Sequence, residues 1–181
     1  MLYWMWTMAK SSQETMMKDE IKVLIILEQH AKDSIDEIAK KCGFSRQKVW
    51  KIIKRLEEQK IIWGYTAVTD ETAQNLKHFI LLVKRSNAPF TQDIQKEVIF
   101  RKLDDYPPGL VRVENIYHTH GISDWVFTFY APDILSAKKF AEKTFNKFSK
   151  YIQEYSILET LVPIRKQGLK NPQIEKLIEY I

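Results

Sequence analysis

Between Ser34 and Leu56 the chain carries two helix-start signals with a glycine between them. Ser34 and Glu37 form a capping-box sequence, in which a hydroxyl and a carboxylate each satisfy a free backbone amide. Gly43 follows where a helix end needs positive φ, and Ser45 is placed to cap the next helix. This succession predicts two short helices joined by a tight turn, which is a helix-turn-helix arrangement.

The segment Lys40–Leu56 predicts a helix with two different faces. Apolar residues recur at i, i+3, i+4 and i+7 and indicate a buried stripe: Val49, Ile52, Ile53 and Leu56. The opposite face carries Gln47, Trp50, Lys51 and Lys54. Every charged residue of the segment is basic, whereas the whole chain has 28 basic and 23 acidic residues. We expect this helix to lie against a polyanion; the alternative is a solvent-exposed face, which normally mixes both signs of charge.

Length and composition set wider bounds. The 181 residues allow one ordinary domain or two small ones, and 45% hydrophobic residues are enough for packed cores. The formal charge of +5 and the pI near 9.1 permit nucleic-acid binding without requiring it. The single cysteine, Cys42, lies on an apolar helix face and excludes an internal disulfide framework or a cysteine-rich zinc site. No apolar run reaches the length of a membrane span, so we expect a cytoplasmic protein that does not contact the membrane.

Residues 1–17 are expected to form an N-terminal extension. Their apolar start is short and lacks a basic beginning, unlike a signal peptide. Two interpretations remain open: an amphipathic extension that packs on another subunit, or a misassigned translation start with Met16 or Met17 as the first residue. The second is slightly favoured, because regular patterning begins only at Lys18.

Residues 18–68 are expected to form the helix-turn-helix domain, with a first helix over 18–30. Its last part, Ile61–Val68, reads as an extended wing or hinge strand. A linker is predicted over 69–76.

Residues 77–165 have a different pattern and indicate a second domain. Strands are expected at 78–84, 111–119, 125–131 and 152–164, and helices at 91–105, before Tyr106–Gly109, and at 134–148. The alternation within the second strand slips between Val113 and Ile116, which suggests a bulge. The order βαββαβ is the ferredoxin-like unit, so the fold class is α+β, a winged helix-turn-helix followed by a ferredoxin-like domain. Residues 166–181 are predicted to be a helical tail begun by Asn171-Pro172.

The third of these strands is apolar on both faces. Trp125, Phe127 and Phe129 lie on one face, and Val126 and Tyr130 on the other. Helices cover only one face of such a sheet, so the other needs a partner, most simply a second copy of the chain. The pattern predicts at least a dimer, unless Trp125 and Tyr130 are merely edge aromatics.

These motifs resemble the Lrp/AsnC (leucine-responsive, or feast/famine) transcription regulators of bacteria and archaea. Ile35–Ser45 is similar to the family's "ELA…VGLS" segment, and Val49–Ile62 to its "V…I-K-R-L-E-x-x-G-I-I" segment. Gly64–Val68 resembles the hinge, and Gly121 to Asp124 the "G-x-y-D" turn of the ligand-sensing domain. The resemblance covers roughly residues 18–165.

Three positions depart from the family pattern. Ile52 stands where an arginine is frequent, and Lys60 where a glycine usually closes the recognition helix, which predicts a differently shaped helix end. Trp50 is a bulky aromatic on the exposed face, where it would either press on a sugar or thymine methyl or pack on the wing.

The resemblance implies a regulator that binds double-stranded DNA as a homodimer or as a larger assembly such as a tetramer or octamer. Gln47 and Lys51 fall where side chains reach base edges, and Ser45 where helix-start amides could hold a phosphate. The candidate DNA-binding residues are Ser45, Arg46, Gln47, Lys48, Trp50, Lys51, Lys54 and Arg55.

The resemblance also implies an amino-acid effector near the "G-x-y-D" turn. Matching positions nominate Gly121 and Asp124, and the sequence adds Thr119 beside them, with His118 and His120 as further neighbours. The alternative is that a glycine and an aspartate are there for the turn alone.

An enzyme is the competing class. His118 and His120 place two imidazoles on one face of a strand end, a possible metal or tetrapyrrole contact. Siroheme decarboxylases share the regulator-like fold, so a decarboxylase of this kind is the alternative function. The sequence shows no third ligand at metal-site spacing, and we expect no catalytic residue, metal or cofactor. A helix-turn-helix used only for protein contacts would favour an acidic or apolar face, which this chain lacks.

Overall fold

The computed structural model describes residues 2–100, 111–146, 148–175 and 178. Its contacts divide the chain into two compact units. The first, here called the head unit, comprises Met1–Val68 and Ile164–Ile174, and the second, the sheet unit, comprises Thr69–Pro163 and Glu175–Ile181. Among the described helices, none combines the length and apolar character needed to span a membrane.

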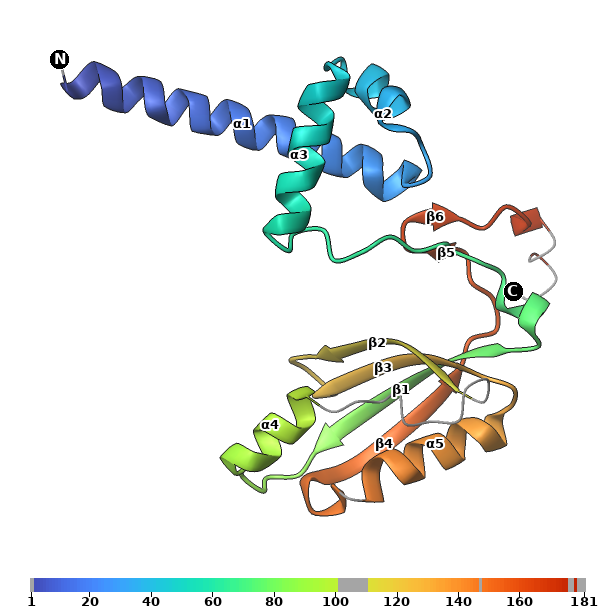
Figure 1. Cartoon of the computed structure of the whole chain (residues 1–181). Coiled ribbons are helices and arrows are strands. Elements are labelled where there is room, and N and C mark those ends of the chain that lie inside the picture. The colour runs from blue at the N-terminus through green and yellow to red at the C-terminus, as the bar shows by residue number, and fades with distance from the viewer. Residues whose placement is uncertain (1, 101–110, 147, 176–177, 179–181) are drawn as a thin grey trace. The chain divides into compact units, whose positions relative to one another are not determined.

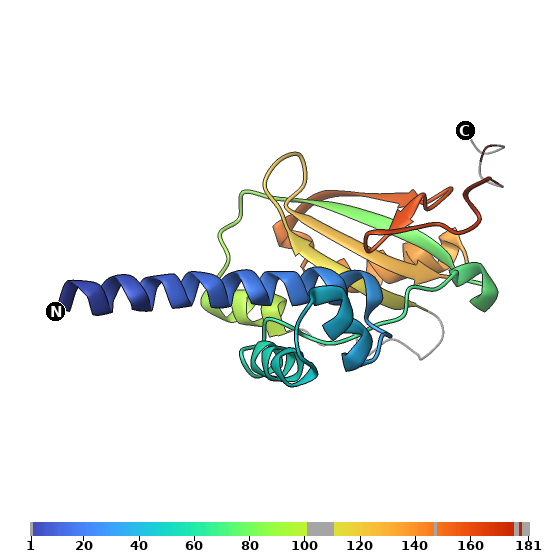
Figure 2. The same ribbon diagram turned by 90° about the horizontal axis from the view of Figure 1, so that it is seen from above.

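The head unit contains three helices, α1 (Leu2–His30), α2 (Ile35–Cys42) and α3 (Arg46–Glu58) (Figure 1). α1 runs without interruption from Leu2, as Figure 2 shows, so the expectation that regular structure begins only at Lys18 is wrong. The physical reason is local: no glycine or proline interrupts this stretch, and the Met, Ala, Lys and Glu residues in it favour a helix.

The three helices bury a mainly aliphatic core. The predicted stripe of α3 is confirmed, because Val49, Ile52 and Leu56 are buried and Ile53 packs beside them. Cys42 is buried, and this burial raises the pKa of its thiol. The core residues are Val23, Leu27, Ile38, Ala39, Cys42, Val49, Ile52 and Leu56.

The capping box at the start of α2 is confirmed. The Ser34 amide donates to Glu37 Oε2 at 2.7 Å, and the Glu37 amide donates to Ser34 Oγ at 3.3 Å. These bonds hold the pKa of Glu37 below its ordinary value. Ser45 caps α3 in the same way, accepting from the Lys48 amide at 3.3 Å.

α2 and α3 end in the same hydrogen-bond pattern. Gly43 closes α2 with φ 64°, and the Phe44 amide donates to the Ala39 carbonyl at 3.0 Å. Lys60 takes the equivalent position after α3 with φ 60°, and the Ile61 amide donates to the Leu56 carbonyl at 2.9 Å. The predicted difference in shape at Lys60 is therefore wrong, because lysine adopts the left-handed conformation that glycine usually supplies.

The segment Ile61–Val68 has no assigned strand, so the predicted wing or hinge strand is not paired within the part of the chain that the structure describes. The Tyr65 hydroxyl donates to Glu57 Oε1 at 2.9 Å and ties the segment to α3. Burial, with this bond, raises the pKa of Tyr65 to about 12.

A two-stranded hairpin completes the head unit. β5 (Arg165–Lys166) and β6 (Leu169–Lys170) are joined by Gln167 and Gly168, both at positive φ, as in a type I′ turn. The expected helical tail from residue 166 is therefore wrong at its start. Asn171 does accept a hydrogen bond from the Gln173 amide at 2.8 Å, and residues 176, 177 and 179–181 of the expected helix lie outside the described residues.

The sheet unit confirms the ferredoxin-like order. Its elements are η1 (Glu71–Gln74), β1 (Lys77–Arg85), α4 (Gln92–Phe100), β2 (Arg112–His118), β3 (Trp125–Ala131), α5 (Ile134–Asn146), η3 (Ser149–Tyr151) and β4 (Ile152–Glu159). The strands pair antiparallel in the order β2-β3-β1-β4, and the predicted bulge appears as a register shift between Val113 and Asn115. β4 ends earlier than the expected Ile164. The expected end of the helix at Asp105 and the turn Tyr106–Gly109 lie outside the described residues.

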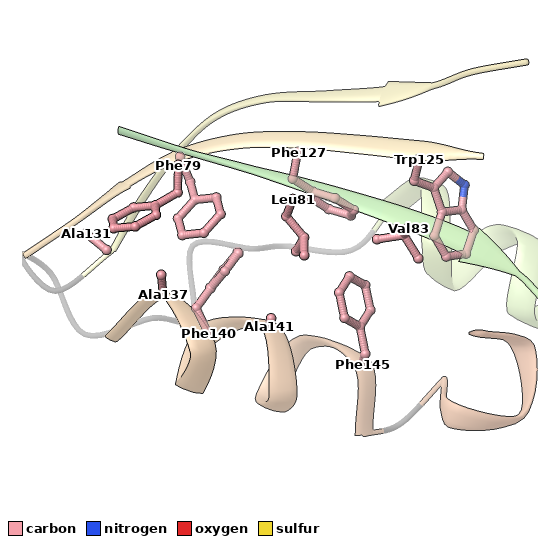
Figure 3. Close-up of a cluster of buried hydrophobic side chains, with 11 residues drawn as sticks. Phe79, Leu81, Val83, Trp125, Phe127, Ala131, Ala137, Phe140, Ala141 and Phe145 are labelled. Carbon is pink, nitrogen blue, oxygen red and sulfur yellow. The ribbon is translucent and has the colours of Figure 1, made fainter. Parts of the chain in front are cut away.

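One face of this sheet packs on α5. Figure 3 shows Phe140, Ala141 and Phe145 of α5 pointing toward the strands, where β1 and β3 present alternate residues. The Phe129 and Phe140 rings lie 4.6 Å apart between centroids. The core is aromatic, in contrast to that of the head unit.

The other face of the sheet carries a polar network among half-buried aliphatic residues. Glu114 accepts hydrogen bonds from the Tyr130 hydroxyl at 2.8 Å and the Thr128 hydroxyl at 2.9 Å, and lies 3.3 Å from His78 Nε2. Burial and the bond to Glu114 raise the pKa of Tyr130 to about 12. Ile80 and Leu82 alternate with the buried residues of β1 and so lie on this face.

Candidate nucleic-acid interface and effector turn

The outer face of α3 presents polar and aromatic side chains to solvent. Gln47, Lys51 and Lys54 are exposed, and the Trp50 side chain is 49% exposed with Lys54 Nζ 5.2 Å from its ring centroid. Within the described residues, no hydrogen bond or ion pair holds Gln47 or Lys51. These two side chains are therefore available to a ligand.

Other predicted DNA-binding residues are engaged inside the head unit. Lys48 pairs with Asp19 of α1 at 2.7 Å, and Lys48 Nζ lies 3.9 Å from the Phe44 ring centroid. Arg55 pairs with Glu20 of α1 at 2.6 Å. Because carboxylates of α1 already balance both cations, Lys48 and Arg55 fasten α1 to the recognition helix.

Arg46 and Lys54 have weaker partners. Arg46 lies 3.2 Å from Asp36, with both side chains more than half exposed, and Lys54 lies 3.8 Å from Glu58. Exposed ion pairs of this kind contribute little, so both cations can turn to another anion.

A surface concavity of about 380 Å³ joins α1 to α3. It brings the predicted residues Ser45, Gln47, Lys48, Lys51 and Arg55 together with Met16, Asp19 and Ile52. Arg55 Nη1 donates to Met16 Sδ at 3.1 Å. Sequence reasoning missed the α1 residues, because only the crossing of two helices places them beside α3.

Trp63 is a second omission. Its side chain is 95% exposed in the extended segment after α3. No periodic pattern distinguishes it, and only the structure shows that nothing in the described chain covers the indole.

The predicted effector residues lie together in the turn between β2 and β3, where their polar groups serve the turn itself. The Thr119 hydroxyl donates to the Ser123 carbonyl at 2.7 Å, and Lys84 Nζ donates to the Gly121 carbonyl at 3.2 Å. Asp124 Oδ2 accepts the Arg85 amide at 2.9 Å and lies 3.4 Å from Lys84 Nζ. Gly121 has φ 134°, a conformation that favours glycine.

The bond from the Arg85 amide, with the nearby Lys84, holds the pKa of Asp124 below its ordinary value. The ionised carboxylate thus anchors the turn to the end of β1. This geometry agrees with the structural explanation of the glycine and aspartate and leaves the ligand role open.

The two histidines of the predicted metal or tetrapyrrole contact are placed differently. His118 Nδ1 accepts a hydrogen bond from Trp125 Nε1 at 2.8 Å, so this nitrogen is already occupied. No group of three potential metal ligands among His, Cys, Asp and Glu occurs in the described part of the chain.

Comparison with known proteins supports the assignment of the two units. A family model described as winged helix-turn-helix DNA-binding matches residues 20–62. Among curated proteins, a sequence search finds no match.

Solved structures are similar over both units. An AsnC family transcriptional regulator from Agrobacterium tumefaciens is 24% identical, with 82% of this chain and 92% of that chain covered and a TM-score of 0.63. A transcriptional regulator of Neisseria meningitidis in complex with L-methionine is 18% identical, with coverages of 91% and 98% and a TM-score of 0.64. A feast or famine regulatory protein from M. tuberculosis complexed with L-methionine is 14% identical, with coverages of 86% and 98% and a TM-score of 0.65. This chain therefore contains a winged helix-turn-helix DNA-binding domain and has the fold of the AsnC and Lrp transcriptional regulators.

Proposed function

We propose that this protein is a sequence-specific DNA-binding transcription regulator that reads DNA with the outer face of α3. The observation that carries the proposal is the free, exposed pair Gln47 and Lys51 on a helix whose opposite stripe is buried. Gln47 and Lys51 would contact base edges, and Trp50 a sugar or a thymine methyl.

Phosphate contacts are assigned to the exposed cations Arg46, Lys51 and Lys54 and to the start of α3, where Ser45 and free amides face outward. Lys48 and Arg55 remain in the proposed surface. Their pairing with Asp19 and Glu20 favours a role in holding α3 rather than in adding phosphate contacts.

A charge-reversal experiment tests this proposal. DNA sites are first selected from a random double-stranded pool with the full chain, and binding is then measured by fluorescence anisotropy at several salt concentrations. The Lys51→Glu, Lys54→Glu variant should lose more than about a hundredfold in affinity, and the salt dependence should flatten by about 0.9 per lost phosphate contact. The Lys138→Glu, Lys139→Glu variant makes the same charge change on exposed α5 residues and should retain most of the affinity. Equal losses in both variants, or no selected site, would refute the assignment to α3.

We also propose that the protein acts as a homodimer or larger assembly formed through the sheet face opposite α5. Half-buried Ile80, Leu82 and Val126 lie on that face, and Leu158 of the edge strand is 48% exposed. Leu158→Glu should shift the mass measured by light scattering toward a monomer. Leu135→Glu, on α5 and 59% exposed, is the matched control and should not.

An amino acid is the proposed effector, because two similar regulators were crystallised with L-methionine. Contacts would come from Thr119, Gly121 and Asp124 at the turn, with backbone groups contributing because the side chains already serve the turn. Titration of the DNA complex with each L-amino acid tests this. Unchanged DNA affinity across the set would refute an amino-acid effector while leaving DNA binding intact.

A further inference from the structure

The sheet unit contains an aromatic pocket that is separate from the residues proposed for DNA and effector. Its volume is about 260 Å³, near the lower end of small-molecule sites. Its inner wall is formed by side chains that are buried: Trp125 at 4%, Phe127 at 7%, Phe145 at 6% and Phe148 at 2% exposure. Because packing already fixes these rings, the wall exists before a ligand arrives.

The mouth of the pocket carries a single imidazole. His118 lines the pocket and is exposed, as is Ile116 beside it on β2, which is 46% exposed. The Trp125 indole nitrogen can only donate, and it lies 2.8 Å from His118 Nδ1, so Nδ1 must accept. The ring proton therefore lies on Nε2, and no described residue bonds to Nε2.

We propose that this pocket binds a small molecule with one aromatic or branched apolar body and a single acceptor oxygen, either a carbonyl or a carboxylate. The apolar body would fill the space between the four buried rings. The acceptor oxygen would stay at the solvent-exposed mouth and accept the Nε2–H of His118. A ligand with only a donor at that end would face another donor and bind less tightly.

The probes are chosen to isolate this end group. 4-Phenyl-2-butanone carries a ketone, 3-phenylpropionate a carboxylate, and 3-phenylpropylamine only donors. Binding to the ¹⁵N-labelled full chain is followed through the Trp125 Nε1–H resonance, which is assigned with Trp125→Phe. We expect at least one acceptor probe to shift this resonance with a dissociation constant roughly three- to tenfold lower than that of the amine. The stronger of the two acceptor probes identifies the chemical source of the oxygen.

Two variants locate the site. Ile116→Trp should fill the pocket and abolish the shift, whereas Leu135→Trp adds the same bulk on exposed α5 and should leave binding unchanged. His118→Phe should keep binding of the apolar body and remove the preference for an acceptor. Failure of all three probes to bind wild-type protein at millimolar concentration overturns the site. Equal binding of all three overturns the role of His118, and the comparison on wild-type protein stands even where a variant does not fold.

Discussion

The head unit and the sheet unit are stabilised in different ways. The head unit starts and ends its helices through bonds between residues a few positions apart, and its core joins three helices that follow one another in the chain. The sheet unit instead pairs β1 with both β3 and β4, so Phe79 lies opposite Phe129 and Glu159 from distant parts of the sequence. The first unit is largely a product of local signals, and the second of long-range pairing.

The difference extends to the candidate sites. The reading face of α3 exists as soon as the helix forms with one stripe buried. The pocket at His118 and the sheet face around Glu114 exist only when β1, β2 and β3 are in register. Local disturbance should therefore harm the head unit moderately, while loss of core packing should harm the sheet unit severely.

The largest effect is expected from the two cores. Phe140→Ala removes a ring that is 1% exposed against Phe129 and should cost the sheet unit about 3–5 kcal/mol. Leu56→Ala, also 1% exposed, should cost the head unit about 2–5 kcal/mol. Amide exchange followed by mass spectrometry in increasing urea assigns each loss to its unit. Faster exchange in α2 and α3 after Phe140→Ala, with β1 and β3 unaffected, would contradict the assignment.

The next effect tests the anchor between the β2–β3 turn and β1. Asp124→Asn weakens a charge-assisted bond to the Arg85 amide and should cost about 1–2 kcal/mol at pH 7, reduced by partial exposure of the side chain. The pKa of Asp124 is lowered by folding, so its contribution is complete above the unfolded pKa near 4 and is lost as pH falls through the lower folded value. Urea unfolding of both proteins should thus converge near pH 2. A constant difference across pH would contradict this origin.

A smaller effect is expected at the start of α2. Ser34→Ala removes the hydroxyl that accepts the Glu37 amide and should destabilise the head unit by about 1 kcal/mol. Ser34→Gly is the matched control, since glycine at this position costs only a few tenths of a kcal/mol. Urea unfolding of the two variants makes the comparison, and equal losses would show that the cap bond is not the cause.

The smallest expected effect has the opposite sign. Lys60→Gly relieves a left-handed lysine at φ 60° and should stabilise the head unit by about 0.5–1 kcal/mol after the greater freedom of unfolded glycine is deducted. Lys60→Ala keeps the strained conformation and should be close to neutral. Thermal unfolding compares the three proteins; a gain from alanine equal to that from glycine would point to the lost charge instead.

Much of the fold follows from local patterns. The capping box at Ser34, the glycine turn at Gly43 and the stripe around Ile52 predict the helix-turn-helix, and alternation with one slip predicts β2 and its bulge. The errors fall where two local choices are close in energy. Residues before Lys18 lack a strong pattern yet form a helix, and the tail turns at Gln167-Gly168 before any helix can begin.

The sequence by itself determined which residues of α3 face outward, because a 3.6-residue repeat with one apolar stripe leaves little choice for the other side. It also determined the order of strands and helices in the second unit. Only the tertiary structure decided that Lys48 and Arg55 are held by Asp19 and Glu20, that the hydroxyl of Thr119 and carboxylate of Asp124 serve their own turn, and that His118 meets Trp125. Each of these depends on an atom-to-atom distance between elements, and periodicity carries no information about such distances.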